Sequence, residues 1–239
     1  LFRSNYKDQI EIYEFYKNIN THVSMNRVFH TKNTDKNKLD LDADDFIKEF
    51  KKYFRYWMFD VNGQHERSAI EAVALVFSYN GRTCSMTDCR HKWLGINPLG
   101  DIYPCDRYYP DRYLVGNVKD FNSIEEMFIS EGYMNYYKDV QKRFDNYCSK
   151  CEIYEECLGG CNANYIELFG TADKQNEGFC YITKELFKFI YEIMRGVDPV
   201  TDTNINPALR MYLLERGVYT VKEIYAFLNK YEIKLDLQY

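Results

Sequence analysis

The sequence predicts an α+β protein in which helices flank a cysteine-rich middle segment built from short extended pieces. Apolar and aromatic residues recur at helical spacing on both sides of that segment. After Asn80-Gly81, a turn signal, residues 82–118 are broken by Gly and Pro and predict a hairpin around Leu99-Gly100. All eight cysteines fall between Cys84 and Cys180, so we expect the chemistry of the chain to reside in the same segment.

The N-terminal part predicts one helix–strand step of an α/β unit, followed by two helices. Apolar spacing predicts an amphipathic helix over 6–18, and residues 22–29 predict a strand. Two helices are predicted over 43–57 and about 66–78. Because the chain begins with Leu1 directly in the first helical pattern, we expect it to be the C-terminal part of a longer protein.

The rest of the chain is predicted to alternate loops and helices. Ser123-x-x-Glu126 is a capping box that predicts a helix running to about 142. The run 148–161 predicts a loop with at most one helical turn, and a helix over 183–195 is stopped by Gly196. Two more helices are predicted in the tail, the first starting at Asn206-Pro207.

Changes in composition predict boundaries near 80 and near 197, which divide the chain into 1–80, 81–196 and 197–239. Hydrophobic residues make up 46% of the chain and charged residues 28%, as in globular proteins. The net charge is −5 and basic residues form no stripe, which argues against a nucleic-acid partner. No apolar run approaches the roughly 20 residues of a membrane span, and no signal peptide opens the chain, so we predict a cytoplasmic protein without a membrane partner.

The spacing of the cysteines predicts metal binding. A single cysteine is usually a small buried hydrophobe, but eight thiols are the number that two four-coordinate centres need. A disulfide scaffold suits short secreted chains, and tight C-x2-C pairs more often hold metal. Uneven spacing, x5 and then x3 in the run from Cys148 to Cys161, differs from the paired knuckles of structural zinc. Spacing alone leaves zinc and iron–sulfur clusters both open, since clusters also accept wide, uneven ligand loops.

The same residues carry a resemblance to a known family. The pattern C-x10-G-x4-C, then C-x2-C-x5-C-x3-C, then a distant cysteine resembles the seven-cysteine signature of the SPASM domain, the C-terminal extension of many radical S-adenosylmethionine enzymes. The matching residues, within 84–180, are Cys89, Gly100, Cys105, Cys148, Cys151, Cys157, Cys161 and Cys180. GDIYPCDRYYPDRYLVGNV and ECLGGCNAN are most similar to the anaerobic sulfatase-maturating branch.

The resemblance implies a three-part architecture and two auxiliary [4Fe–4S] clusters with interleaved ligands. Residues 1–80 would be the remnant of a partial (β/α)₆ barrel with its connecting helices, 81–196 the SPASM domain, and 197–239 a helical extension. The implied ligands of the first cluster are Cys84, Cys89, Cys105 and Cys161. The implied ligands of the second cluster are Cys148, Cys151, Cys157 and Cys180. Gly100, Gly159 and Gly160 would let backbone N–H groups approach the cluster sulfurs.

Asp106 follows Cys105 and matches the position of the general base in the maturases. A carboxylate there can take a proton from a substrate thiol or hydroxyl. The alternative is a structural carboxylate that caps a turn or pairs with Arg107 or Arg112.

Two features depart from the family pattern. The C-x3-C-x2-C motif of radical S-adenosylmethionine enzymes is absent from this chain, so S-adenosylmethionine and a third [4Fe–4S] cluster are expected in the full-length parent. Asn162-Ala163-Asn164 replace the Pro and basic residues that usually follow the cysteine quartet in sulfatase maturases, which leaves peptide-modifying relatives open.

The function that the resemblance implies is oxidation of a Cys or Ser side chain of a peptide or protein to formylglycine. An electron acceptor such as ferredoxin or flavodoxin would be the second partner. One alternative is a maturase that crosslinks or otherwise oxidises a ribosomally made peptide. Another, from a different class, is a non-catalytic module that binds metal and docks a peptide.

Overall fold

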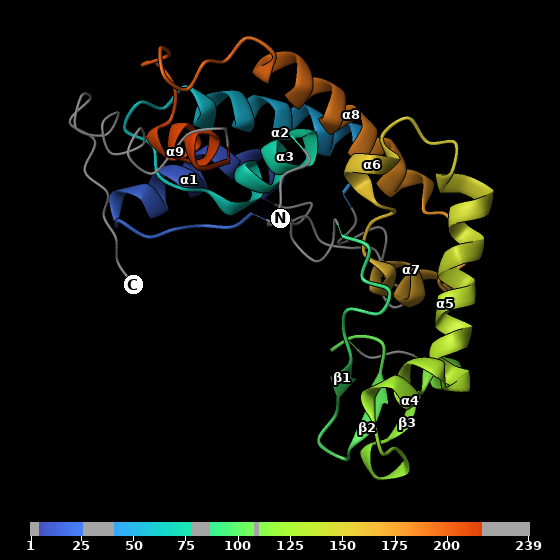
Figure 1. The fold of residues 1–239 in the computed structure, drawn as a ribbon. Helices are drawn as coiled ribbons and strands as arrows, with labels where there is room; N and C mark the ends of the chain where they lie inside the picture. The colour runs from blue at the N-terminus through green and yellow to red at the C-terminus, as the bar shows by residue number, and fades with distance from the viewer. Residues whose placement is uncertain (1–4, 26–40, 78–86, 108–109, 217–239) are drawn as a thin grey trace. The chain divides into compact units, whose positions relative to one another are not determined.

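The computed structural model describes residues 5–25, 41–77, 87–107 and 110–216 (Figure 1). The chain divides into two compact units, each with its own core. Of the described residues, 5–25, 41–77 and 185–216 belong to unit 1, and the others belong to unit 2. The mixture of helices with one small sheet confirms the predicted α+β class. The division at 80 and 197, and the barrel remnant, stay predictions.

Unit 1 is helical in its described part. It contains the 3-10 turn η1 (Tyr6–Asp8), α1 (Gln9–Asn18), α2 (Ala43–Met58), α3 (Arg67–Phe77), the end of α8 (Glu177–Met194) and α9 (Pro207–Arg216). In α2 the side chain of Asp42 caps the first turn by accepting from the N–H groups of Asp44 and Asp45. The aromatic side of the same helix, predicted from its spacing, is buried through Phe54 and Trp57.

Two of the sequence predictions change in detail. The described residues 22–25 form one isolated parallel bridge, between Val23 and Glu66, in place of the predicted strand; residues 26–29 lie outside the described part. Helix α8 begins at Glu177, six residues before its predicted start. None of the helices in the described part of the chain is long and apolar enough to cross a membrane.

Asn206 connects α9 to the end of α2 inside the core of unit 1. Its side-chain oxygen accepts from the backbone N–H of Ala208 at 2.8 Å, which is the cap that the Asn-Pro start predicts. Its amide group donates to the carbonyl of Trp57 at 3.1 Å, and its backbone N–H donates to the carbonyl of Met58 at 2.7 Å. The side chain of Asn206 is fully buried, so these bonds have no competition from water.

Unit 2 is built from a three-stranded antiparallel sheet and short helices. The sheet has the order β1 (Gly95–Ile96), β2 (Asp101–Tyr103) and β3 (Gly116–Asn117). The remaining elements are η3 (Asp111–Tyr113), η4 (Val118–Asp120), α4 (Ile124–Ile129), α5 (Glu131–Arg143), the π-helical turn η5 (Phe144–Cys148), α6 (Tyr154–Cys157), α7 (Asn162–Phe169) and the start of α8. The predicted hairpin is confirmed, with Gly100 at φ +88° between the first two strands.

The helix predicted from Ser123 to about 142 is two helices. Ser123 caps α4 as expected, since its hydroxyl accepts from the N–H of Glu126 at 3.3 Å. Ser130 then leaves the helical region, with ψ at 156°, and caps α5 by accepting from the N–H of Tyr133. A serine that hydrogen-bonds the following turn competes with helix continuation, and here it ends one helix and starts the next.

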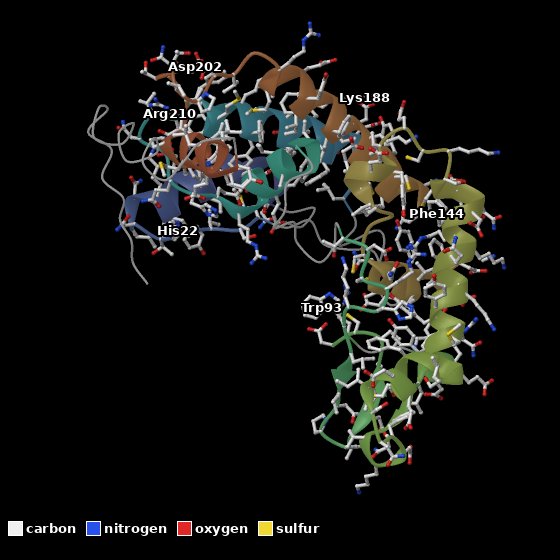
Figure 2. All side chains as sticks on the ribbon, in the orientation of Figure 1. His22, Trp93, Phe144, Lys188, Asp202 and Arg210 are labelled. Atoms are coloured by element: carbon white, nitrogen blue, oxygen red, sulfur yellow. The ribbon has the colours of Figure 1, made fainter. Side chains whose placement is uncertain are left out.

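The core of unit 2 lies between the sheet, α5 and α7. It is dominated by tyrosines whose hydroxyls are satisfied inside the protein, as for Tyr113, which donates to Asp139 at 2.5 Å. The buried residues are Ile102, Tyr113, Val115, Tyr133, Tyr136, Val140, Ala163, Ile166 and Ala172. Cys105 and Cys161 pack against this core from its edge. Trp93, just before β1, is exposed (Figure 2).

The cap at α9 yields a stability prediction. Asn206→Ala should lower the free energy of unfolding by about 2–3 kcal/mol, because a helix cap and a buried side-chain donor are lost together. Chemical denaturation followed by circular dichroism measures this change. The control is Asn204→Ala, two residues earlier and exposed, which should change the free energy of unfolding by less than about 0.5 kcal/mol. Equal effects of the two variants would contradict the role given to Asn206.

Candidate metal centre

Four thiols of unit 2 line one cavity. The cavity has a volume of about 120 Å³, and its lining includes Cys148, Cys151, Cys157 and Cys180. All four are free thiols of intermediate burial. They come from separate elements, since Cys148 ends η5, Cys157 ends α6 and Cys180 lies in the first turn of α8. These are the four residues that the resemblance assigns to the second cluster.

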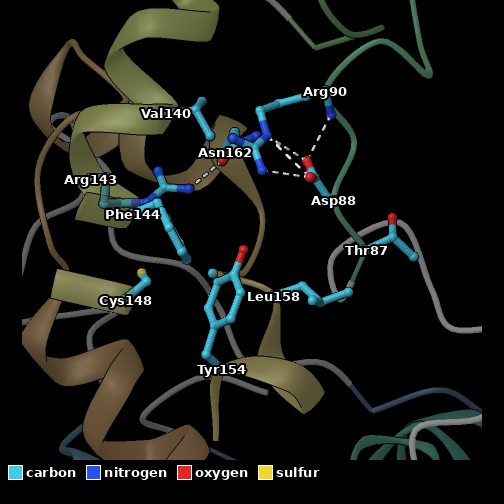
Figure 3. Close-up of a pocket in the computed structure, with 11 residues that line it drawn as sticks. Thr87, Asp88, Arg90, Val140, Arg143, Phe144, Cys148, Tyr154, Leu158 and Asn162 are labelled. Atoms are coloured by element: carbon cyan, nitrogen blue, oxygen red, sulfur yellow. Dashed lines mark hydrogen bonds and ion pairs between the residues drawn. The ribbon is translucent and has the colours of Figure 1, made fainter. Parts of the chain in front are cut away.

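The local backbone explains how thiols so close in sequence converge. The helix α5 passes into a π-helical turn before Cys148, a widened turn that is frequent at functional sites. Phe144 begins this turn, and its ring packs against Tyr154 with centroids 4.9 Å apart (Figure 3). After Cys157, three residues in a row adopt positive φ: Leu158 at 50°, Gly159 at 83° and Gly160 at 72°. This reversal folds the chain back over the cavity.

The glycines also allow close approach. A Cβ at Gly160 would lie 2.6 Å from the ring of Phe179, so a larger residue does not fit there. The backbone N–H of Gly159 donates to the thiol of Cys157. Backbone donors of this kind orient metal ligands and stabilise negative charge on sulfur. The backbone N–H of Gly159 thus lies next to a sulfur, as the sequence analysis expected of this glycine.

Without a bound cation the cavity disfavours thiolates. Burial raises the pKa of Cys157 to about 12. Burial is also the main cause that raises the pKa of Cys148 and of Cys180 above its usual value. Cysteine thiols must be deprotonated to bind metal. A bound cationic group would therefore supply the positive charge that compensates four thiolates in the cavity.

In the described part of the chain, the thiols around the cavity do not converge on one point. Among the described residues, no three His, Cys, Asp or Glu side chains are close enough together to hold a single metal ion. Zinc would need its sulfur ligands at about 2.3 Å from one point. Four cysteines spread around a cavity are the donor set of a [4Fe–4S] cluster.

The other thiols lie outside that cavity. Cys89, Cys105 and Cys161 do not line it. Asn162 donates to the sulfur of Cys89 at 3.2 Å, and Arg107 donates to the sulfur of Cys161 at 3.7 Å. Cys84, the fourth implied ligand of the first cluster, lies outside the described residues.

Asp106 is exposed at the end of the hairpin segment. Its carboxylate accepts from the thiol of Cys105 at 3.1 Å. Within the described part of the chain, neither predicted arginine partner pairs with it. Arg107 pairs with Glu167 at 2.8 Å, and Arg112 pairs with Asp139 at 2.6 Å.

Sequence reasoning missed two buried residues beside the thiols, Arg143 and Asn162. Both line a small crevice of about 10 Å³, roughly the space of one water molecule. Figure 3 shows the guanidinium of Arg143 directed at the side-chain oxygen of Asn162, and Cys148 lines the same crevice. The position of Asn162 directly after Cys161 was the available signal. Nothing in the pattern of α5 distinguished Arg143 from a solvated helix arginine.

Comparison with protein families finds a match within unit 2. Residues 84–152 match the SPASM family, an iron–sulfur cluster-binding domain. The match includes Cys84, Cys89, Cys105, Cys148 and Cys151 and ends before the remaining three cysteines.

Sequence relatives extend the comparison. The chain is 26% identical over 157 residues to the cysteine-type anaerobic sulfatase-maturating enzyme of Clostridium perfringens (strain 13 / Type A), covering 63% of this chain and 41% of the relative. It is 31% identical over 68 residues to the mycofactocin maturase MftC of Mycobacterium ulcerans (strain Agy99), covering 28% of this chain and 18% of that protein. The chain therefore spans less than half of the curated relatives it matches.

Solved structures of anSMEcpe share the fold. One, of a histidine-tagged form with bound AdoMet, matches with a TM-score of 0.59 and 20% identity over 82% of this chain and 54% of that chain. Another holds AdoMet and the Cp18Cys peptide and matches with a TM-score of 0.55 and 20% identity over 80% of this chain and 54% of that chain. Together these matches confirm the predicted resemblance to radical S-adenosylmethionine enzymes with a SPASM domain.

The glycine reversal yields a prediction about the cavity. Gly160→Ala should lower the free energy of unfolding by about 1–2 kcal/mol, because alanine disfavours positive φ and its Cβ meets Phe179. Iron bound by the anaerobically purified chain should fall in parallel. The control is Gly178→Ala in α8, where a Cβ finds only the side chain of Asn176, at 3.6 Å, so stability and iron content should not decrease. Retained iron and stability in Gly160→Ala would show that the reversal does not shape the cavity.

Proposed function

We propose that this chain is the auxiliary-cluster part of a radical S-adenosylmethionine/SPASM enzyme that oxidises a Cys or Ser side chain of a peptide or protein to formylglycine. The observation that carries the proposal is the cavity lined by four thiols. Its position beside a segment that matches an iron–sulfur cluster-binding domain supports a cluster there. Of the two relatives compared above, the sulfatase-maturating enzyme covers the larger part of the chain, which supports the reaction.

The residues fit two cluster sites. Cys148, Cys151, Cys157 and Cys180 would hold one cluster, and Cys84, Cys89, Cys105 and Cys161 the other. When bound, such clusters supply electron transfer, and with four cysteine ligands each they leave no iron open to substrate. S-adenosylmethionine and its own [4Fe–4S] cluster would bind elsewhere in the parent enzyme, and a ferredoxin- or flavodoxin-type protein would carry electrons away.

Asp106 would act as the base for the substrate. Its carboxylate is exposed, so a docked peptide can reach it, and it adjoins the thiol of Cys105. It would accept the proton of the substrate thiol or hydroxyl, a task for which general bases need direct hydrogen-bond reach. Arg107 and Arg112 are held by other carboxylates and leave this one available.

A second candidate is a maturase that crosslinks or otherwise oxidises a ribosomally made peptide. The 31% identity to mycofactocin maturase favours it, because that identity is higher than the 26% found with the sulfatase-maturating relative, although over a shorter stretch. Asn162-Ala163-Asn164 also departs from the sulfatase-maturase pattern. Incubating the complete enzyme with a sulfatase-derived Cys peptide separates the two, because only the first candidate predicts formylglycine by mass spectrometry.

Metal analysis tests the cluster proposal. The chain purified without oxygen should carry about eight iron and eight sulfide, as two four-iron clusters require. Cys180→Ala should lose one cluster and Cys161→Ala the other, so their electron paramagnetic resonance spectra should differ and each should keep about half the iron. Tightly bound zinc in protein made with ample iron would contradict the proposal, as would identical spectra from the two variants.

The base is tested in the complete enzyme. Asp106→Asn keeps the size of the side chain but removes its basicity, so product formation should fall by about 10²–10⁴-fold while S-adenosylmethionine cleavage and iron content are retained. The matched control is Asp111→Asn, an exposed carboxylate five residues further on, which should turn over normally. Normal turnover by the Asp106 variant would assign the base to another residue.

A further inference from the structure

Arg143 is a buried cation without a carboxylate partner among the described residues. The residue as a whole is 3% exposed. It donates to the carbonyl of Ala172 at 2.8 Å and to the side-chain oxygen of Asn162, and its guanidinium lies 4.0 Å from the ring centre of Tyr165. Asp88, which lines the same crevice, pairs with Arg90 at 2.6 Å instead.

The buried charge of Arg143 needs a compensating negative charge, and the sulfur of Cys148 lies on the same side of Gly159. Isolated charges are expensive to bury, and buried ones are usually paired or coordinate a metal. A Cβ at Gly159 would lie 3.6 Å from Nη2 of Arg143 and 3.9 Å from Sγ of Cys148, so the guanidinium and the thiol face the same point. Thiolates around a bound cluster would supply the missing negative charge.

Asn162 extends this contact to the other group of thiols. A guanidinium has only donors, so the amide oxygen of Asn162 must face Arg143 and the amino group must point away. That amino group donates to the sulfur of Cys89 at 3.2 Å and to the hydroxyl of Tyr136 at 2.6 Å. Asn162 is itself buried. Arg143 thus fixes the orientation of a donor on a sulfur that the resemblance assigns to the first cluster.

We propose that Arg143 and Asn162 are positioning residues that raise the reduction potentials of both clusters, Arg143 by its charge beside Cys148 and Asn162 by its hydrogen bond to Cys89. The inference rests on the proposed function in that two clusters must be bound. Reduction adds negative charge to a cluster, and nearby positive charge and donors to its sulfurs stabilise that state. Both residues lie inside the protein, where solvent screens such effects little.

The test is a redox titration of the full chain with dithionite, read by electron paramagnetic resonance, with signals assigned from Cys161→Ala and Cys180→Ala. In Arg143→Gln, the ratio of reduced to oxidised cluster at a fixed potential should fall about tenfold for the Cys148 cluster, equal to about 59 mV for one electron. The Cys89 cluster should shift in the same direction, because Asn162 loses the contact that orients it. Arg143→Lys keeps the charge and should restore most of the first shift but not the second.

Two further variants keep the inference falsifiable. Asn162→Ala should lower the reduction potential of the Cys89 cluster alone. If Arg143→Gln fails to fold, this variant still tests whether the donor on Cys89 raises that potential. Lys142→Gln removes the same charge from the neighbouring position, where the side chain is 61% exposed and pairs with Asp173, and should leave both potentials unchanged. Unchanged potentials in Arg143→Gln and Asn162→Ala with both clusters present would overturn this inference alone. A wild-type chain without clusters would overturn the proposed function and this inference with it.

Discussion

The burial of four thiols around one cavity is the constraint on which the rest of unit 2 depends. Thiols that line a shared cavity repel one another once ionised, and burial raises the pKa of Cys148, Cys157 and Cys180, to about 12 for Cys157. The protein therefore surrounds them with positive charge and donors: the guanidinium of Arg143 and the N–H of Gly159. These groups would stabilise thiolates only in part, and a metal group bound in the cavity would supply the remaining positive charge. The backbone reversal after Cys157 brings those donors within reach.

The same demand explains the irregular backbone near the thiols. The π-helical turn from Phe144 widens the last turn after α5 and ends on Cys148, which lines the cavity. Leu158, a non-glycine residue at positive φ, has a conformational cost that packing around it must offset. Such strain next to ligands is expected where the bound group, and not the apolar core, sets the geometry.

Elements with a strong local signal were predictable from the sequence. Features that depend on contacts between residues distant in the sequence were not. The aromatic period predicted α2 to within one residue of its end, and Asn206-Pro207 predicted the start of α9. Ser130 carried no signal that distinguished it from an exposed mid-helix serine, so the break between α4 and α5 was missed. The cysteine spacing predicted metal but not which thiols share a cavity, which only the family resemblance grouped. Arg143 was missed because burial of a helix arginine depends on partners, Asn162 and Ala172, that are distant in sequence.

Among the described residues of this unit, Arg107 and Arg143 both lie beside thiols, and their surroundings differ. Arg107, beside Cys161, is 36% exposed and paired with Glu167, so its charge is screened by water and largely cancelled by a carboxylate. Arg143 is buried and pairs with no carboxylate among the described residues. Its positive charge therefore acts on the nearby thiols with little screening. The pairing of Arg107 with Glu167 has a second effect, because it keeps a cation next in sequence to Asp106 from neutralising that carboxylate. The exposed edge of the unit thus retains an accessible carboxylate, while its buried centre retains, among the described residues, a cation without a carboxylate partner beside the sulfurs.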